Sequence, residues 1–155
     1  MNFRTAIVLA VFAVAGNAAE LSIGNATLNT TTGQPVTLNV SLASAGATLT
    51  GIQFDLEYDA AALNVTIAAG PAAGGAGKNL QSSALQAGRQ RVLIVGMNRN
   101  TIADGVVAVL QISLKGHVAA GKTFAIRMTA PAGTNAQAQA VSISGGNGSV
   151  QVENK

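Results

Sequence analysis

The chain has 155 residues, the length of a single domain, and it contains no cysteine. Disulfides therefore contribute nothing to its stability, and the fold must rest on its hydrophobic core. Its formal net charge of +3 comes from nine basic and six acidic residues. The arginines do not form one run, so the clustered cations that nucleic-acid binding requires are missing and no nucleic-acid partner is expected.

Residues 1–19 have the pattern of a secretory signal peptide. Arg4 supplies a positive charge, residues 6–15 are uninterrupted apolar residues, and Ala18 and Ala19 offer a small-residue cleavage site. The apolar stretch is shorter than the roughly 20 residues that a membrane-spanning helix needs. We therefore expect a secreted protein, extracellular or periplasmic, with no membrane contact after cleavage. We expect its domain to cover residues 20–152, followed by a short tail at 153–155.

The remaining chain is dominated by alternation of apolar and polar residues, the pattern of half-buried strands. It is clearest in residues 36–42, 52–58 and 124–128, and two shorter candidates lie at 21–28 and 144–152. Residues 91–97 and 106–114 are apolar on both faces over part of their length, which indicates central strands. Glycine-containing turns separate these segments, and the pattern predicts an all-β, antiparallel sandwich.

Two connecting segments lack this alternation. Residues 59–63 begin with Asp59, which can cap a single helical turn before the next strand. Residues 68–77 consist almost entirely of Ala and Gly, and we expect them to form a mobile loop.

The aromatic residues outside the signal segment are Phe54, Tyr58 and Phe124, and all three alternate in step with core positions. Polysaccharide-binding surfaces use exposed rings that stack on sugars, so a flat aromatic platform is not expected here. The single histidine, His117, lies in a predicted turn with no catalytic or metal-binding companions, and we expect it on the surface.

Three polar residues, Gln53, Asp55 and Glu57, share one face of the strand at 51–58. They either contact a partner or form an ordinary solvated strand face. Paired carboxylates can also act as glycosidase acids, but an open strand face does not desolvate either group, so we expect no enzyme activity.

A loop at 98–104 offers the oxygen donors Asn98, Asn100 and Asp104, which make it a weak candidate for calcium. Its acidic content is below that of an EF-hand loop, and such residues are common in loops. We therefore expect no metal and no cofactor.

Four sequence segments, in this order and spacing, resemble a cohesin domain, the receptor module of cellulosome scaffolds. They are LSIGNAT at 21–27, GIQFDLEYDAAAL at 51–63, RVLIVGM at 91–97 and NTIADGVVAVLQISLK at 100–115. Within them, Tyr58-Asp59 with Leu63, and Asp104-Gly105 before an apolar strand, match the pattern of the family.

The resemblance implies a jelly-roll β-sandwich of about nine strands, related to carbohydrate-binding modules. It also implies that one sheet face holds a dockerin, a small calcium-loaded helical module of another protein. That face would include Gln53, Asp55 and Glu57. By alignment Leu93 and Val95 point inward, which leaves Val92 and Ile94 outward as apolar contacts for the partner. Cohesins often present an Asn or Asp pair on the earlier strand, where this chain has Gly51 and Gln53.

Together these observations predict a non-catalytic, secreted binding module that holds a protein, of the dockerin type, in assemblies that degrade extracellular polysaccharides. A carbohydrate-binding module, taking part directly in polysaccharide binding, is one alternative. A structural component of the cell surface is the other.

Overall fold

The computed structural model describes residues 19–154. The predicted signal segment therefore lies outside the described residues, apart from Ala19, which begins the first strand.

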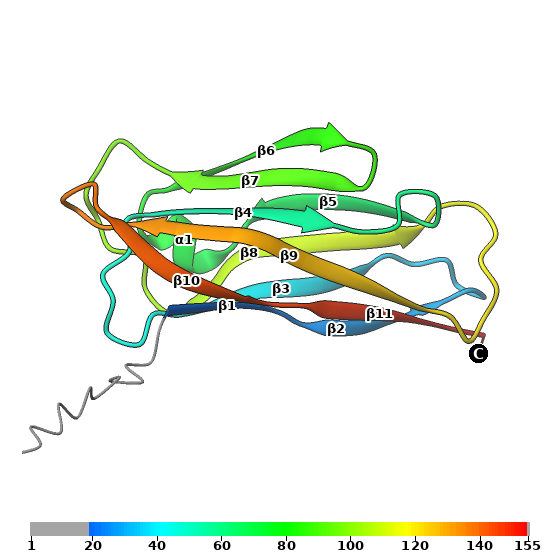
Figure 1. Cartoon of the computed structure of the whole chain (residues 1–155). Helices are drawn as coiled ribbons and strands as arrows, with labels where there is room; N and C mark the ends of the chain where they lie inside the picture. Colours follow the sequence, from blue (N-terminus) through cyan, green and yellow to red (C-terminus); the bar gives the residue numbers. More distant parts are fainter. Residues whose placement is uncertain (1–18, 155) are drawn as a thin grey trace, which may run out of the picture.

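Eleven strands and one short helix form two layers around a common core (Figure 1). In chain order the strands are β1 Ala19–Ile23, β2 Asn25–Asn29, β3 Val36–Ala43, β4 Gly51–Glu57, β5 Leu63–Ala69, β6 Asn79–Gln86, β7 Arg89–Val95, β8 Gly105–Leu114, β9 Thr123–Thr134, β10 Ala140–Gly146 and β11 Gly148–Glu153. One layer has the order β5-β8-β3-β1 and the other β9-β4-β7-β6, and β10 joins them by pairing with both β1 and β9. The predicted all-β sandwich is confirmed.

The predicted nine strands become eleven because the first and last strands are each interrupted once. Gly24 separates β1 from β2, and Asn147 separates β10 from β11. The two breaks lie side by side, and a Cβ atom on Gly148 would lie 2.3 Å from the carbonyl oxygen of Gly24. These terminal strands also run parallel to each other, β1 with β10 and β2 with β11, whereas the other neighbours are antiparallel as predicted.

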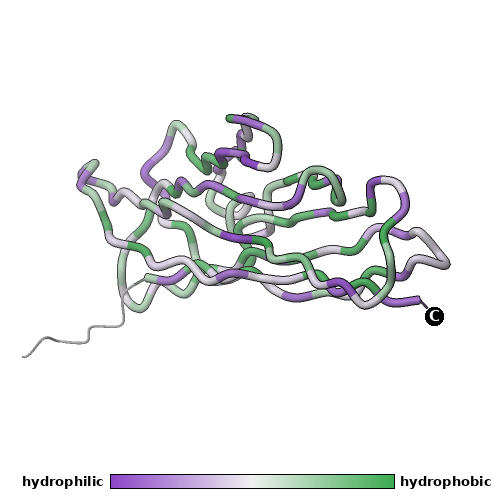
Figure 2. Tube along the Cα trace, turned by 45° about the vertical axis from the view of Figure 1, so that its right-hand side comes forward, coloured by the Kyte–Doolittle hydropathy of each residue, from purple (hydrophilic) through white to green (hydrophobic). Residues whose placement is uncertain are grey.

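The core lies between the layers and is built from the alternating apolar residues of the strands. Hydrophobic and hydrophilic residues follow one another along the strands (Figure 2). Phe54 is fully buried, whereas Tyr58 and Phe124 are partly buried and pack against the core. The aromatic residues therefore have the predicted core positions. His117 is exposed after β8, also as predicted.

One connection differs from the prediction and another agrees with it. The expected mobile loop at 68–77 contains the helix α1, Pro71–Gly75, which packs against β8 and buries Ala73 completely. Gly70 lets this backbone approach the sheet closely, because a Cβ atom there would lie 2.4 Å from the carbonyl oxygen of Val106. At residues 59–63 the predicted single turn is present: the backbone N–H of Leu63 donates to the carbonyl oxygen of Asp59 at 2.9 Å, and the Asp59 carboxylate caps the turn by accepting the backbone N–H of Ala61 at 2.9 Å.

The strand β6 was not predicted, because NLQSSALQ has no regular apolar alternation. It lies at the open edge of its layer, and most of its residues are exposed. Across residues 19–154, no helix has the length and apolar character to cross a membrane.

Candidate binding face

The outward surface of β9, β4 and β7 is the candidate site, and we call it the β4–β7 face. The register of β4 with β7 places Gln53 opposite Leu93, Asp55 opposite Arg91 and Glu57 opposite Arg89. Directly opposed residues in a sheet point to the same side. Gln53, Asp55 and Glu57 therefore share one side of the sheet, as their alternation indicated.

The predicted orientation of β7 was wrong. Val92 and Ile94 are fully buried in the core, where they oppose Phe54 and Ile52. They cannot contact a partner, and Leu93 and Val95 point outward in their place. Residues 92–95 are all apolar, so alternation gave no means of distinguishing the two faces of this strand.

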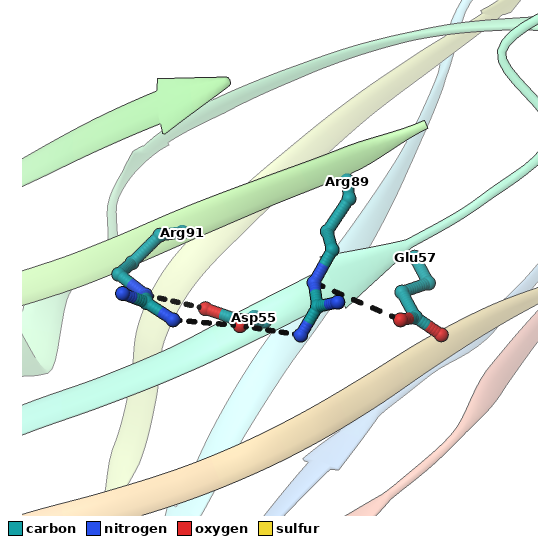
Figure 3. A network of polar contacts seen from close by, with 4 residues as sticks. All are labelled: Asp55, Glu57, Arg89 and Arg91. Carbon is teal, nitrogen blue, oxygen red and sulfur yellow. Dashed lines mark hydrogen bonds and ion pairs between the residues drawn. The ribbon is translucent and has the colours of Figure 1, made fainter. Parts of the chain in front are cut away.

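At one end of the face, two arginines hold a buried carboxylate (Figure 3). Arg91 donates from Nε to Asp55 Oδ1 at 2.9 Å and from Nη2 to Oδ2 at 3.2 Å, and Arg89 Nη2 donates to Oδ2 at 3.1 Å. The Asp55 side chain is 1% exposed, whereas those of Arg89 and Arg91 are 35% and 46% exposed. The arginines therefore cover the carboxylate and carry the charge that solvent meets.

The same contacts set the protonation of Asp55. The Arg91 hydrogen bonds, aided by those from Arg89, lower the pKa of Asp55 although burial acts in the opposite direction. A carboxylate held ionised in this way cannot supply a proton near neutral pH. This geometry does not fit a glycosidase acid, which needs a raised pKa.

This charged end retains unmet hydrogen-bonding capacity. Arg89 Nε lies 3.8 Å from Glu57 Oε1, beyond hydrogen-bond length, and it is buried without a partner. The hydroxyl of Thr129, which opposes Asp55 from β9, is likewise buried and has no partner. Most buried polar atoms in proteins are paired, so two such atoms beside one carboxylate distinguish this end of the face.

The other end of the face is a shallow apolar hollow of about 140 Å³. Gly51 forms its floor, because a Cβ atom there would lie 2.8 Å from Thr134 Oγ1 and 3.5 Å from Val95 Cγ1. Its walls are Gln53, Leu93, Val95, Ala132 and Thr134. A cavity of about 150 Å³ takes one benzene ring, so this hollow has room for one apolar side chain of a partner.

A bulge in β9 separates the two ends. Gln53 pairs with Ala132 and Asp55 with Thr129, so Ala130 and Pro131 together oppose Phe54. Ala130 has a φ of 48°, a left-handed conformation that costs an L-residue free energy. Bulges bend a strand and redirect its side chains.

The side chains of the three weak calcium candidates have hydrogen-bond partners within the protein. The Asn98 side-chain oxygen accepts the Lys78 ammonium at 2.6 Å and the backbone N–H of Asn100 at 3.0 Å, so a cation of the protein already occupies this donor. Asp104 points elsewhere and accepts the backbone N–H of Ser44 at 2.9 Å. Among residues 19–154 no three His, Cys, Asp or Glu side chains gather as metal ligands.

Sequence reasoning missed the arginines Arg89 and Arg91 and the buried ammonium of Lys78. A signal for the arginines was present. Arg89 and Arg91 repeat at the two-residue spacing of Asp55 and Glu57, and such a repeat indicates opposite charges facing each other on paired strands.

Comparisons with known proteins agree with this architecture. The model of the family described as "Cohesin domain" matches residues 19–152. Comparison with curated protein sequences gives no match.

Three solved structures illustrate the similarity. The sixth cohesin of scaffoldin B from Acetivibrio cellulolyticus, solved with a mutant Cel5 dockerin, has a TM-score of 0.76 at 24% identity, covering 88% of this chain and 99% of that one. The OlpC cohesin of Clostridium thermocellum, in complex with Doc435, has a TM-score of 0.74 at 14% identity, with coverages of 89% and 95%. A non-cellulosomal cohesin from the archaeon Archaeoglobus fulgidus has a TM-score of 0.70 at 14% identity, with coverages of 87% and 91%.

Proposed function

The chain belongs to the cohesin family, and we propose that it is a non-catalytic, secreted module that binds a dockerin-type protein through its β4–β7 face. The observation that carries the proposal is the pairing, on one open sheet face, of an apolar hollow with anchored arginines. Protein interfaces commonly combine an apolar centre with arginine and a polar rim. Cohesins of Acetivibrio cellulolyticus and Clostridium thermocellum are known in complex with dockerins, which supports this class of partner.

The residue set proposed for contact differs from the sequence-based one. Gln53 and Glu57 remain partner-contact residues, and Asp55 acts through the arginines that cover it. Leu93 and Val95 take the roles first given to Val92 and Ile94.

Direct polysaccharide binding gains no support from this face. The ring of Phe54 is fully buried, and Tyr58 and Phe124 pack against the core. The walls of the hollow contain no aromatic residue to stack on a sugar.

Calorimetric titration with dockerin modules encoded in the same genome tests the proposed function. We expect at least one of them to bind with a dissociation constant in the micromolar range or below, and Val95→Arg to abolish that binding. Val109→Arg is the matched control, since Val109 is a partly exposed valine on β8 of the opposite layer. Absence of binding by every dockerin, or equal losses in the two variants, would contradict the proposal.

Secretion and a place in polysaccharide-degrading assemblies are further parts of the proposal. The signal-like pattern of residues 1–19 supports export. Mass spectrometry of the mature protein should find it beginning at Ala19 or Glu20, and an intact Met1 in the exported fraction would contradict export.

Dockerins that bind should belong to enzymes acting on polysaccharides. Binding only to dockerins of other proteins would remove the link to polysaccharide degradation.

A further inference from the structure

We infer that the partner of the β4–β7 face presents an acidic side chain to Arg91 and, about two helical turns away, an aliphatic side chain to the hollow over Gly51. This inference deepens the proposed function and rests on it. It specifies the chemistry and spacing of the partner surface.

The sign of the charge follows from what the partner can reach. Asp55 is negative, but it lies beneath two guanidinium groups and is 1% exposed. Glu57 is 36% exposed, but it lies 3.8 Å from Arg89, which is 35% exposed, so the charges of these two residues offset one another. Among the ion pairs within residues 19–154, Arg91 engages Asp55 alone and uses Nε and Nη2, and its side chain is 46% exposed. The net charge that a partner can reach at this end is therefore positive and lies on Arg91, and a carboxylate is its complement.

A second positive side chain extends this region. Arg127 on β9 opposes Glu57 from the side of β4 away from Arg89, and it is exposed. A partner that approached with lysine or arginine would meet Arg91 and Arg127. A second copy of this chain would bring the same arginines against one another, which disfavours self-association through this face.

Asp55 fixes the position of the guanidinium groups. Its two oxygens receive three hydrogen bonds between 2.9 and 3.2 Å from two arginines. Arginine loses side-chain freedom when it binds a ligand, and a side chain already held in place loses less. Asp55 is therefore a positioning residue, which needs no contact with the partner.

The spacing follows from the strand geometry. The hollow lies over the rows of Gly51 and Gln53, and Arg91 lies in the row of Asp55. The midpoint of the hollow, between Gly51 and Gln53, is thus three residues along β4 from Asp55, a separation of about 10 Å at the rise of a β-strand. Residues i and i+7 of an α-helix lie on one side of the helix and about 10.5 Å apart. One helix lying along β4 satisfies both ends of the face.

The test uses a defined probe and needs no natural partner. A stable three-helix bundle, randomised at eight outward positions over about four turns of one helix, is displayed on yeast and selected against the purified protein. Binders that Val95→Arg abolishes are retained as binders of this face. We expect them to carry Asp or Glu seven positions from Leu, Ile or Val, in either order.

Charge and shape variants then measure each end. Arg91→Glu should weaken the selected binders at least 30-fold, and the milder Arg91→Gln at least threefold, with circular dichroism unchanged. Affinity for the wild-type protein should fall as salt rises, and this dependence should be reduced for Arg91→Gln. Gly51→Val should weaken them at least tenfold because it fills the hollow. Lys122→Glu, an identical charge change in the exposed turn before β9, and Gly74→Val, at a position with open space, should each stay within twofold.

Lys or Arg at the acidic position, or no preference there, overturns the inference. An affinity that Arg91→Glu leaves unchanged overturns it as well, and so does a library in which no binder depends on this face. Failure of the proposed function gives a different result: the selected binders carry the acidic residue, but no dockerin binds the protein. If dockerins bind with equal affinity to the wild-type protein and to Arg91→Glu, the proposed function stands and the inference falls.

Discussion

The two ends of the β4–β7 face lie on the same strands but are built by opposite means. At the charged end a buried carboxylate positions two arginines, and the long side chains of these arginines form the surface there. At the apolar end the absence of a side chain at Gly51 creates the hollow. Affinity and charge selectivity can therefore come from different parts of one sheet face, since the hollow supplies apolar burial and the arginines select the charge of the partner.

The largest expected effect is on the apolar end. Leu93→Asp places a charge in the wall of the hollow, and we expect it to weaken partner binding about 100-fold, as loss of a central contact does. Leu85→Asp is the matched control, because Leu85 is an exposed leucine on β6 that does not line the hollow. Titration calorimetry on both variants measures this. Equal weakening by the two would mean that the hollow is not the centre of the interface.

Removing the charge of Asp55 tests how the charged end is held. Asp55→Asn should lower the free energy of unfolding by about 2 kcal/mol, since hydrogen bonds to charged groups contribute roughly 1.5–3 kcal/mol each and the exposed arginines regain water. Glu57→Gln, which disrupts a 3.8 Å contact between half-exposed groups, should stay within about 0.5 kcal/mol. Urea denaturation of both variants provides the comparison. A smaller loss for Asp55→Asn than for Glu57→Gln would contradict the anchoring role.

The charged end should also respond to acid. The pKa of Asp55 is lowered in the folded chain, whereas in the unfolded chain an aspartate has a pKa of about 3.9. As pH falls, Asp55 therefore takes up its proton in the unfolded chain before it does so in the folded one. The stabilisation is fully present above that unfolded pKa and is lost as pH falls through the folded pKa. The stability difference between wild type and Asp55→Asn should therefore shrink below about pH 4. Denaturation curves between pH 7 and pH 2 measure it, and a difference that is constant with pH would show that the carboxylate is not held ionised.

The smallest effect is expected at the bulge between the two ends. Ala130 has a φ of 48°, and glycine adopts this conformation without strain. Ala130→Gly should therefore raise the free energy of unfolding by about 0.5 kcal/mol, because the relief of backbone strain exceeds the cost of ordering the more flexible glycine on folding. Thr123→Gly, in the extended part of β9, should have the opposite sign. Thermal denaturation distinguishes the two. Destabilisation by Ala130→Gly would mean that the bulge is not strained.

Much of the fold could be predicted, because alternation directly reports which side of a strand is buried. Leu38, Val40 and Phe54 are buried as their alternation indicated. The same reasoning failed where alternation was absent. In β7 four consecutive apolar residues gave no basis for choosing a face, and β6 has no regular pattern. Low complexity does not distinguish close packing from disorder, so the sequence predicts a mobile loop where the structure has helix α1.

The candidate site could be predicted only in part, because it depends on which strands are neighbours. Asp55 was identified as a polar outward residue, but its burial depends on Arg91, 36 residues away in the sequence. The hollow depends on the pairing of Gly51 on β4 with Thr134 on β9. A glycine in a strand does not by itself reveal what its missing side chain leaves open.

The most direct test of the β4–β7 face is methyl nuclear magnetic resonance of the protein titrated with a dockerin found by calorimetry. The account predicts that the methyl signals of Leu93 and Val95 shift or broaden together at stoichiometric dockerin. The signals of Val109, on the outward side of the opposite layer, should stay in place. Shifts at Val109 with unchanged signals at Leu93 and Val95 would place the interface on the other layer and contradict the account.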